Sequence, residues 1–397
     1  MSSHGIKDQV AIVGMGCTNF GERWDMSTAD LAVEASEAAF ASAGVKKDQV
    51  DAYWLGTLTS GFSGMTLSTA LKIDYKPVTR VENFCASGSE AFRNACYAVA
   101  SGAYDVAMAV GVEKLKDSGY SGLHREEPPN AGTFGTLTAP ARFSMLAPAY
   151  AEKYGVSRDD FKSAMTRTAW KNHYNGARNP RAQFRAEVPE EKIRNSPRVA
   201  GELGVFDCAG VSDGAAAAVI VRAEDAYKYS DNPLFVKALA FAAGPGTGTN
   251  DPEFGYTSFE EVVQSAADAY SQAGVEKPLD DLMMCEVHDC FTPTELLLME
   301  DLGFSERGRA WSDALADKYT LSGELPINPD GGLKSFGHPI GASGLRMLFE
   351  CWLQLRGEAP EGRQIPAKGK KYGLTQNLGG GPGECVSFVA IVGAEKG

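Results

Sequence analysis

The stretch Val-Glu-Ala-Ser-Glu-Ala-Ala-Phe-Ala-Ser-Ala-Gly-Val-Lys-Lys at residues 33–47 recurs as Val-Gln-Ser-Ala-Ala-Asp-Ala-Tyr-Ser-Gln-Ala-Gly-Val-Glu-Lys at residues 263–277. The two segments align at a constant offset of 230 residues, which takes Gly44 to Gly274. Each shows apolar residues at helical spacing and ends in glycine, as a capped amphipathic helix does. The identical pairs are Val33/Val263, Ala39/Ala269, Ala43/Ala273, Gly44/Gly274, Val45/Val275 and Lys47/Lys277.

The segments around these helices are repeated as well. Strands are predicted before each helix, at 9–13 and 234–240, and after each helix, at 53–55 and 283–287. Further along each half, Ala86-Ser-Gly88 has a counterpart in Ala342-Ser-Gly344, and the strand at 217–221 has one at 385–392. A repeated unit of alternating strands and helices predicts two α/β halves related by a pseudo-twofold axis, with mixed sheets covered by helices on both faces.

The chain length of 397 residues exceeds one ordinary core, so more than one domain is expected. Between the repeats, residues 115–205 are rich in Pro, Gly, Arg and Asn, with amphipathic helices near 147–154 and 159–174. We therefore expect one half to comprise 1–114 plus 206–232, an inserted domain at 115–205, and a second half at 233–397. Residues 153–198 carry eleven Lys/Arg against five Asp/Glu, which indicates either an anion-binding insert or a solvated helical face.

The overall composition excludes several classes of protein. A formal net charge of −13 argues against a nucleic-acid partner or an anionic membrane surface, and no apolar run approaches membrane-spanning length. Eight irregularly spaced cysteines without a secretory signal indicate reduced thiols in the cytoplasm, and the lack of a Cys-x-x-Cys pair argues against structural zinc. The Gly14-Met-Gly16 start of a dinucleotide fingerprint lacks its third glycine and its ribose-binding acid.

Cys85 is the first candidate catalytic residue. It lies in Val81-Glu-Asn-Phe-Cys-Ala-Ser-Gly-Ser89, where small residues follow the cysteine and a helical apolar pattern begins. The N–H groups and dipole at a helix start favour the thiolate, the reactive form of cysteine. The alternative is a buried, inert cysteine.

Two histidines stand out in the second half. His288 begins His-Asp-Cys-Phe at the end of the predicted strand 282–287, where functional groups of α/β folds gather. Cys285, His288 and Cys290 suggest a metal cluster, but strand alternation places them on different faces, so no metal site is predicted. His338 projects from Gly337-His-Pro at a helix entry equivalent to that of Cys85, so imidazole and thiol can meet across the two halves. A structural histidine is the alternative.

The segment Asn377-Leu-Gly-Gly-Gly-Pro-Gly383 is expected to be a flexible loop before the last strand. Its backbone N–H groups could complete an oxyanion hole with the N–H of Cys85. The alternative is a simple glycine-rich turn. A phosphate-binding loop is excluded because no Lys-Ser/Thr pair follows.

These four stretches, in this order on a duplicated α/β body, resemble the thiolase family over nearly the whole chain. Ser212-Asp-Gly-Ala-Ala-Ala217 is also typical of thiolases, and His-Asp-Cys-Phe is similar to the sterol-carrier-protein-type and archaeal-type branches. The resemblance implies the duplicated thiolase fold with five-layer α-β-α-β-α packing and a helical lid at 115–205. The chain departs from the common pattern at Asn377, where most thiolases carry a cysteine.

The resemblance implies an acyltransferase that cleaves a 3-oxoacyl-CoA, or runs the reverse Claisen condensation, with coenzyme A as co-substrate and no permanently bound cofactor. It assigns Cys85 as the nucleophile, His338 as its base and Cys290 as the acid that protonates the leaving carbanion. His288 and His338 would donate to the thioester oxygen, and the N–H groups of Cys85 and Gly379 to the acyl oxygen. The basic lid would hold the CoA phosphates.

The resemblance also implies partners and alternatives. A homodimer core is expected, together with a small zinc-ribbon/OB-fold subunit that related thiolases bind. Some relatives cleave aromatic 3-oxoacyl-CoAs such as benzoylsuccinyl-CoA. The alternatives are a thiolase-like carbon–carbon lyase of the retro-aldolase kind, a non-catalytic acyl-CoA-binding subunit and a ketoacyl synthase. The presence of Cys85 and His338 argues against the first two, and the Gly-His-Pro and His-Asp-Cys-Phe stretches against the third.

Overall fold

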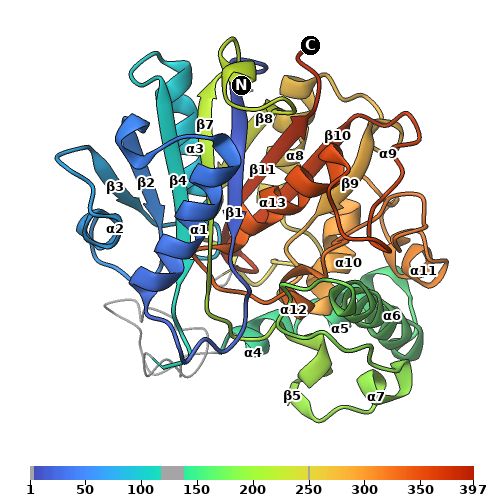
Figure 1. The fold of residues 1–397 in the computed structure, drawn as a ribbon. Helices are drawn as coiled ribbons and strands as arrows, with labels where there is room; N and C mark the ends of the chain where they lie inside the picture. Colours follow the sequence, from blue (N-terminus) through green and yellow to red (C-terminus); the bar gives the residue numbers. More distant parts are fainter. Residues whose placement is uncertain (1–3, 118–137, 249–250) are drawn as a thin grey trace.

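The computed structural model describes residues 4–117, 138–248 and 251–397. Its strands form one hydrogen-bonded sheet in the order β3-β2-β4-β7-β1-β8-β11-β10-β9, with a separate hairpin of β5 and β6 (Figure 1). The strands are β1 Val10–Cys17, β2 Ala52–Gly56, β3 Val78–Val81, β4 Val106–Glu113, β5 Arg198–Ala200, β6 Leu203–Gly204, β7 Gly214–Arg222, β8 Leu234–Ala243, β9 Leu282–Glu286, β10 Tyr372–Gly381 and β11 Glu384–Gly393.

Two equivalent half-sheets meet at β1 and β8. These two strands pair only through Ala11 with Phe235 and Ile12 with Leu234, whereas each pairs at length with its other neighbour. From this junction, β1-β7-β4-β2 in one direction mirrors β8-β11-β10-β9 in the other. The predicted duplication is therefore confirmed, with the pseudo-twofold axis at the β1–β8 junction.

Helices complete the layers. The α-helices are α1 Thr28–Ala43, α2 Met65–Leu71, α3 Ser87–Ala100, α4 Ala139–Phe143, α5 Leu146–Tyr154, α6 Arg158–Ala177, α7 Glu190–Arg194, α8 Glu260–Ala273, α9 Pro278–Asp281, α10 Thr292–Asp301, α11 Ala310–Leu315, α12 Gly332–Ser335 and α13 Ser343–Arg356. Single 3₁₀ turns are η1 Lys47–Gln49, η2 Val205–Asp207 and η3 Ala226–Lys228. None of the helices in the described part of the chain is long and apolar enough to cross a membrane.

The hydrophobic cores show five layers, α-β-α-β-α. The buried residues of α1 pack on the outer face of the first half-sheet, those of α8 pack on the outer face of the second, and α3 and α13 share the core between the half-sheets. Alternation along β1 follows the layers, since Val10 and Ile12 face the central core and Ala11 and Val13 the outer one. Both faces are buried because helices cover both.

Several local predictions can be compared with the structure. The repeated helices are present, and Gly44 and Gly274 end them in the left-handed region at φ 64° and 73°. Gly14 serves helix packing, since a Cβ there would lie 2.6 Å from the Ala39 carbonyl oxygen of α1. The expected flexible loop at 377–383 is wrong: residues up to Gly381 belong to β10, because they pair with β11 in continuous register.

Helices α4–α7 and the β5–β6 hairpin lie between β4 and β7 in the chain, and α5, α6 and α7 gather at the lower edge of the molecule in Figure 1. Most of the basic side chains of this segment are held in ion pairs with acidic ones. The pairs are Arg142–Glu384, Arg158–Glu202, Lys162–Asp207, Arg167–Glu190, Arg167–Asp317, Lys171–Glu295, Arg178–Glu187 and Arg194–Asp159. The local excess of positive charge therefore leaves few cations for a ligand.

Candidate active site

Cys85 lies in a tight turn between β3 and α3. The hydroxyl of Ser87 donates to the Phe84 carbonyl oxygen at 2.6 Å and accepts from the N–H of Asn83 at 3.0 Å, which closes the turn. The turn holds Phe84 in the left-handed region at φ 49°, an unfavourable conformation for an aromatic residue. It leaves Cys85 half-buried just before the first turn of α3.

The starts of α3 and α13 face one another, as the duplication predicts. A Cβ on Gly88 would lie 2.6 Å from the Gly341 carbonyl oxygen, and one on Gly344 would lie 2.6 Å from the Ser89 nitrogen. Glycine is therefore required at both positions, because only it permits this backbone approach. The contact joins the half that carries Cys85 to the half that carries His338.

His338 is positioned by two serines. Its backbone N–H donates to the hydroxyl of Ser212, 3.0 Å away in the Ser-Asp-Gly loop. Its ring nitrogen Nδ1 lies 2.7 Å from the hydroxyl of Ser343 at the start of α13. Its Nε2 is buried and has no hydrogen-bond partner among the described residues. This nitrogen is therefore free to act on a neighbouring group.

His288 follows β9 and lies beside His338, with ring centroids 5.4 Å apart and the planes nearly perpendicular at 85°. Its backbone N–H donates to the side-chain oxygen of Gln376 at 3.3 Å, and its ring nitrogen Nδ1 lies 3.0 Å from Nδ2 of Asn377. Gln376 and Asn377 are both on β10. The thiol sulfur of Cys85 and one ring nitrogen from each histidine lie within 4.8 Å of one another. The structure thus brings together three of the predicted site residues from three separate parts of the chain.

Cys290 and Gly379 lie around this group. Cys290 is buried, its sulfur is 3.9 Å from the Thr294 hydroxyl, and the charge of a Cys85 thiolate would raise its pKa further above the level set by burial. Gly379 on β10 lies against the carbonyl of Asn83, two residues before Cys85, at a distance that excludes a side chain.

The interior position makes the three central groups neutral at rest. Burial and the Glu113 carboxylate raise the pKa of Cys85 to about 12 and so oppose the effect expected of the helix start. Burial and the Arg346 guanidinium lower the pKa of His338 to about 3. Burial, with smaller effects from His338 and Arg346, lowers the pKa of His288 well below its usual value. A proton must therefore move during the reaction rather than before it.

Three buried side chains hold the site but were not predicted. Glu113 accepts hydrogen bonds from the 57–60 turn and from the N–H of Gly341. Asp289 accepts from the N–H of Leu333 at 2.6 Å, and burial together with Glu295 raises its pKa to about 7. Arg346 pairs with Glu286 and Asp330 in the interior. A charged residue at the end of a buried strand, as in Val-Gly-Val-Glu113, is the only local signal for Glu113.

Comparison with protein families shows the family to which the chain that carries this site belongs. The thiolase N-terminal domain matches residues 10–224, and the thiolase C-terminal domain-like family matches residues 252–391. The chain is a thiolase. Its relatives support this: the acetyl-CoA acetyltransferase of Methanothermobacter thermautotrophicus is 38% identical over 94% of this chain and 96% of its own length. Human sterol carrier protein 2 is 32% identical over 94% of this thiolase and 70% of its own length. The predicted sterol-carrier-protein-type and archaeal-type resemblance is confirmed.

Solved structures share the fold. The human mitochondrial 3-ketoacyl-CoA thiolase superposes with a TM-score of 0.69 over 98% of this thiolase and 99% of that chain, at 20% identity, and has also been solved with CoA. The structure named Ltp2-ChsH2(DUF35) aldolase superposes with a TM-score of 0.83 over 99% of both chains, at 25% identity. Taken with the family match and the acetyl-CoA acetyltransferase relatives, the protein is a thiolase-type acyltransferase that uses CoA thioesters.

Proposed function

We propose that this thiolase cleaves a 3-oxoacyl-CoA with free CoA through an acyl-Cys85 intermediate. The observation that carries the proposal is the meeting of a thiol and two imidazoles within 4.8 Å. The neutral base His338 and the neutral thiol of Cys85 lie together in the interior, so the proton passes from sulfur to nitrogen only as the sulfur attacks the substrate.

The reaction assigns one step to each group. Nε2 of His338 takes the proton of Cys85, and the thiolate attacks the 3-keto carbon. The C2–C3 bond breaks and its electron pair passes into the thioester as an enolate. The thiol of Cys290 then protonates C2, which releases the short C1–C2 CoA thioester and leaves the remaining acyl chain on Cys85. The thiol of a second CoA then gives its proton to the Cys290 thiolate and attacks acyl-Cys85, which forms the second acyl-CoA. The Cys85 sulfur leaves and regains its proton from His338. The Claisen condensation reverses the same steps.

Hydrogen-bond donors stabilise the two developing oxyanions. His288, with His338 once it is protonated, faces the thioester oxygen that becomes enolate-like. The N–H groups of Cys85 and Gly379 are assigned to the acyl oxygen, a role supported by the contact of Gly379 with the Cys85 turn.

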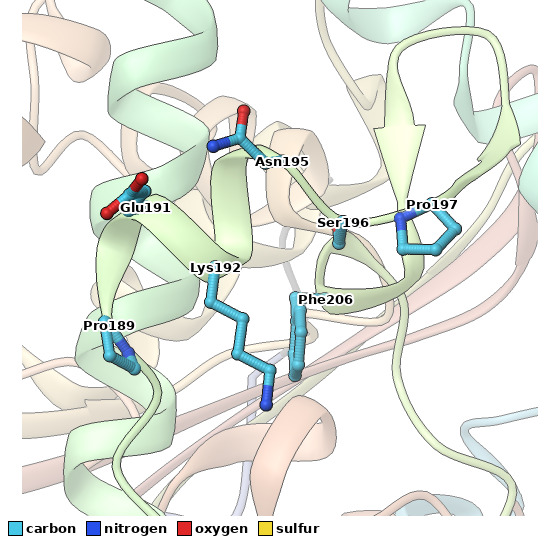
Figure 2. A pocket seen from close by; sticks show the side chains of 7 residues that line it. All are labelled: Pro189, Glu191, Lys192, Asn195, Ser196, Pro197 and Phe206. Carbon is cyan, nitrogen blue, oxygen red and sulfur yellow. The ribbon is translucent and has the colours of Figure 1, made fainter.

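The lid offers a cation beside a cavity for the anionic end of CoA. A cavity of about 450 Å³ is lined by Lys192, Phe206, Glu191 and neighbouring residues of the 189–197 segment (Figure 2). Lys192 projects beside the ring of Phe206, 5.9 Å from its centroid, and makes no ion pair with the acidic residues that the structure describes. Phe206 leads into the segment whose Ala209 N–H donates to the Cys290 carbonyl at 2.8 Å. We assign Lys192 to the CoA phosphates.

A homodimer fits the free edge of the sheet. Within the described part of the chain, β3 is hydrogen-bonded to β2 alone, and the aromatic side chains of Phe62, just before α2, and of Tyr75, just before β3, are almost fully exposed. A second copy that adds its own β3 covers both the edge and these side chains. Light scattering should give a dimer, and the double variant Phe62→Ser/Tyr75→Ser, which removes the exposed aromatic side chains, should give a monomer.

A small zinc-ribbon/OB-fold partner also belongs to the proposal. It is supported by the likeness to the solved Ltp2-ChsH2(DUF35) aldolase, whose name includes a DUF35 protein. The eight cysteines are all free in the structure, which supports a reducing, cytoplasmic location.

The same likeness, at the higher TM-score of 0.83, favours a second candidate function, a retro-aldol lyase. A lyase needs no acyl-enzyme and therefore no free CoA as acceptor. A 3-hydroxyacyl-CoA that is cleaved without added CoA would support this candidate.

The test of the main proposal is incubation with acetoacetyl-CoA and free CoA, followed by mass detection of the products. Cys85→Ala should abolish cleavage, whereas Cys96→Ala, at a buried cysteine of the α3 helix that follows Cys85, should leave it intact. Full cleavage by Cys85→Ala would overturn the proposal. Extending the panel to longer and aromatic 3-oxoacyl-CoAs, including benzoylsuccinyl-CoA, identifies the substrate.

A further inference from the structure

His288 and His338 have different neighbours at Nδ1. The partner of His338 is the hydroxyl of Ser343, and the partner of His288 is the side-chain amide of Asn377. A neutral imidazole carries a single proton, so the group at Nδ1 decides whether Nε2 donates or accepts. Burial keeps the pKa of both rings below their usual value, so both are neutral at pH 7.

The hydroxyl of Ser343 has one hydrogen, which it donates to the Pro339 carbonyl oxygen at 3.0 Å. With that hydrogen on Pro339, the hydroxyl accepts from His338, and the proton of His338 lies on Nδ1. The unpartnered Nε2 then holds a lone pair. In this tautomer, Nε2 of His338 can accept a proton and act as a base.

The amide of Asn377 is held in one orientation. Its Oδ1 accepts a hydrogen bond from the hydroxyl of Ser89 at 3.0 Å, and its Nδ2 lies 3.4 Å from the Leu378 carbonyl oxygen. Nδ2 therefore faces His288, to which it can only donate. Nδ1 of His288 must accept, and the proton of this ring lies on Nε2.

We propose that Asn377 is a positioning residue that fixes the proton of His288 on Nε2, so that the two imidazoles facing Cys85 are opposite tautomers, one donor and one base. The inference rests on the proposed function for its chemical meaning: the thioester oxygen gains negative charge during cleavage and needs the Nε2–H of His288. The geometry itself is independent of that function.

A carboxylate at residue 377 would have the opposite effect. It would accept the proton of Nδ1 and leave a lone pair on Nε2 of His288. The sulfur of Cys85 and two imidazole lone pairs, within 4.8 Å of one another, would then form a Cys-His-His set suited to Zn²⁺. A carboxylate behind a histidine is also the common outer partner of zinc-bound imidazole. The amide thus protects the nucleophile from chelation.

The direct test is ¹⁵N NMR of histidine-labelled protein, which reports which ring nitrogen carries the proton. The chain has only five histidines, and the His288→Ala and His338→Ala variants assign the two signals. We expect His288 protonated at Nε2 and His338 at Nδ1. The same tautomer in both rings would overturn the proposal. Because no turnover is involved, failure of the proposed function would not disturb this result.

The variants Asn377→Asp and Asn377→Leu separate the effect of a negative charge at residue 377 from the effect of losing the amide donor. Titration with Zn²⁺ alone should show Asn377→Asp binding about 10–100-fold more tightly than wild type, and the gain should vanish in Asn377→Asp/Cys85→Ala. Asn377→Leu, similar in size but without a donor, should gain no zinc affinity.

In both variants kcat for thiolysis should fall about 10²–10³-fold, while acyl-Cys85 still forms from an activated thioester. Zinc affinity and a His288 Nε2–H signal that are unchanged in Asn377→Asp would overturn the proposal. Thermal melting of each variant identifies any that fails to fold.

Discussion

The carboxylate of Glu113 accepts a hydrogen bond from the N–H of Gly341 at 3.0 Å, and so ties the end of β4 to the turn that presents His338. The same carboxylate accepts N–H groups from Leu58, Thr59 and Ser60. A single buried anion therefore organises turns from both halves of the molecule. It lies close enough to Cys85 to raise the pKa of the thiol.

Glu113→Gln should lower the free energy of unfolding by about 2 kcal/mol or more, because the amide group leaves buried N–H donors without an acceptor. Chemical denaturation measures this loss. Removal of the charge should also lower the pKa of Cys85, which shifts the pH dependence of its alkylation downward. Glu82→Gln, at an exposed acid near Cys85, should leave the stability almost unchanged, and equal losses in the two variants would contradict the role of Glu113.

The raised pKa of Cys85 predicts how the substrate-free enzyme reacts with iodoacetamide. Only the thiolate reacts, so the rate constant should rise about tenfold per pH unit from pH 7 to about pH 10. Mass spectrometry locates the label, and Cys85→Ser supplies the background rate. A plateau at pH 6–8 would mean instead that a thiolate–imidazolium pair already exists at rest.

Cys290→Ala should lower kcat for thiolysis about 10²–10⁴-fold, the usual contribution of a positioned acid. Acyl-Cys85 should still form from an activated thioester, because that step needs only Cys85 and His338. Rapid quenching with mass detection separates the two steps. Cys285→Ala, a buried cysteine of β9, serves as the control, and normal turnover in Cys290→Ala would remove this thiol from the mechanism.

His173 on α6 predicts part of the acid sensitivity of the fold. Burial, with a smaller effect from the Lys334 ammonium, lowers its pKa from 6.5 to about 3. The unfolded chain binds a proton there between pH 6.5 and 3 and the folded chain does not, so stability is lost as the pH falls through this range.

In His173→Phe, whose ring can pack on Phe184 and Phe206, the slope of unfolding free energy against pH should fall by about 1.4 kcal/mol per pH unit near pH 5. Denaturation curves at several pH values measure the slope. His4→Asn, at an exposed site, is the control, and an unchanged slope in His173→Phe would refute the assignment.

The sequence predicts the fold through the repeat at 33–47 and 263–277, because its helical period and terminal glycine survive in both copies. Cys85 and His338 were predicted to meet for the same reason, since equivalent helix starts face each other across the twofold axis. The strand at 377–381 was missed because three of its five residues are glycine, which carry no apolar alternation. Its conformation comes from pairing with β11 instead.

Other parts of the site depend on distant contacts. The pKa of Cys85 is set by burial and by Glu113, 28 positions along the chain, and both oppose the local effect of the helix start. The effect of Asn377 on His288 depends on a rotamer that Ser89 holds. Neither relationship leaves a periodic or local pattern in the sequence.

The close approach of Gly88 to Gly341 has a consequence for how the protein can be divided. The nucleophile Cys85 belongs to the first half, while His338, His288 and Asn377 belong to the second. Each half alone is therefore catalytically inactive. Two separately expressed fragments, cut near residue 232 between η3 and β8, would gain activity only on reassociation. Enzyme turnover would then report fragment complementation directly, without an attached reporter.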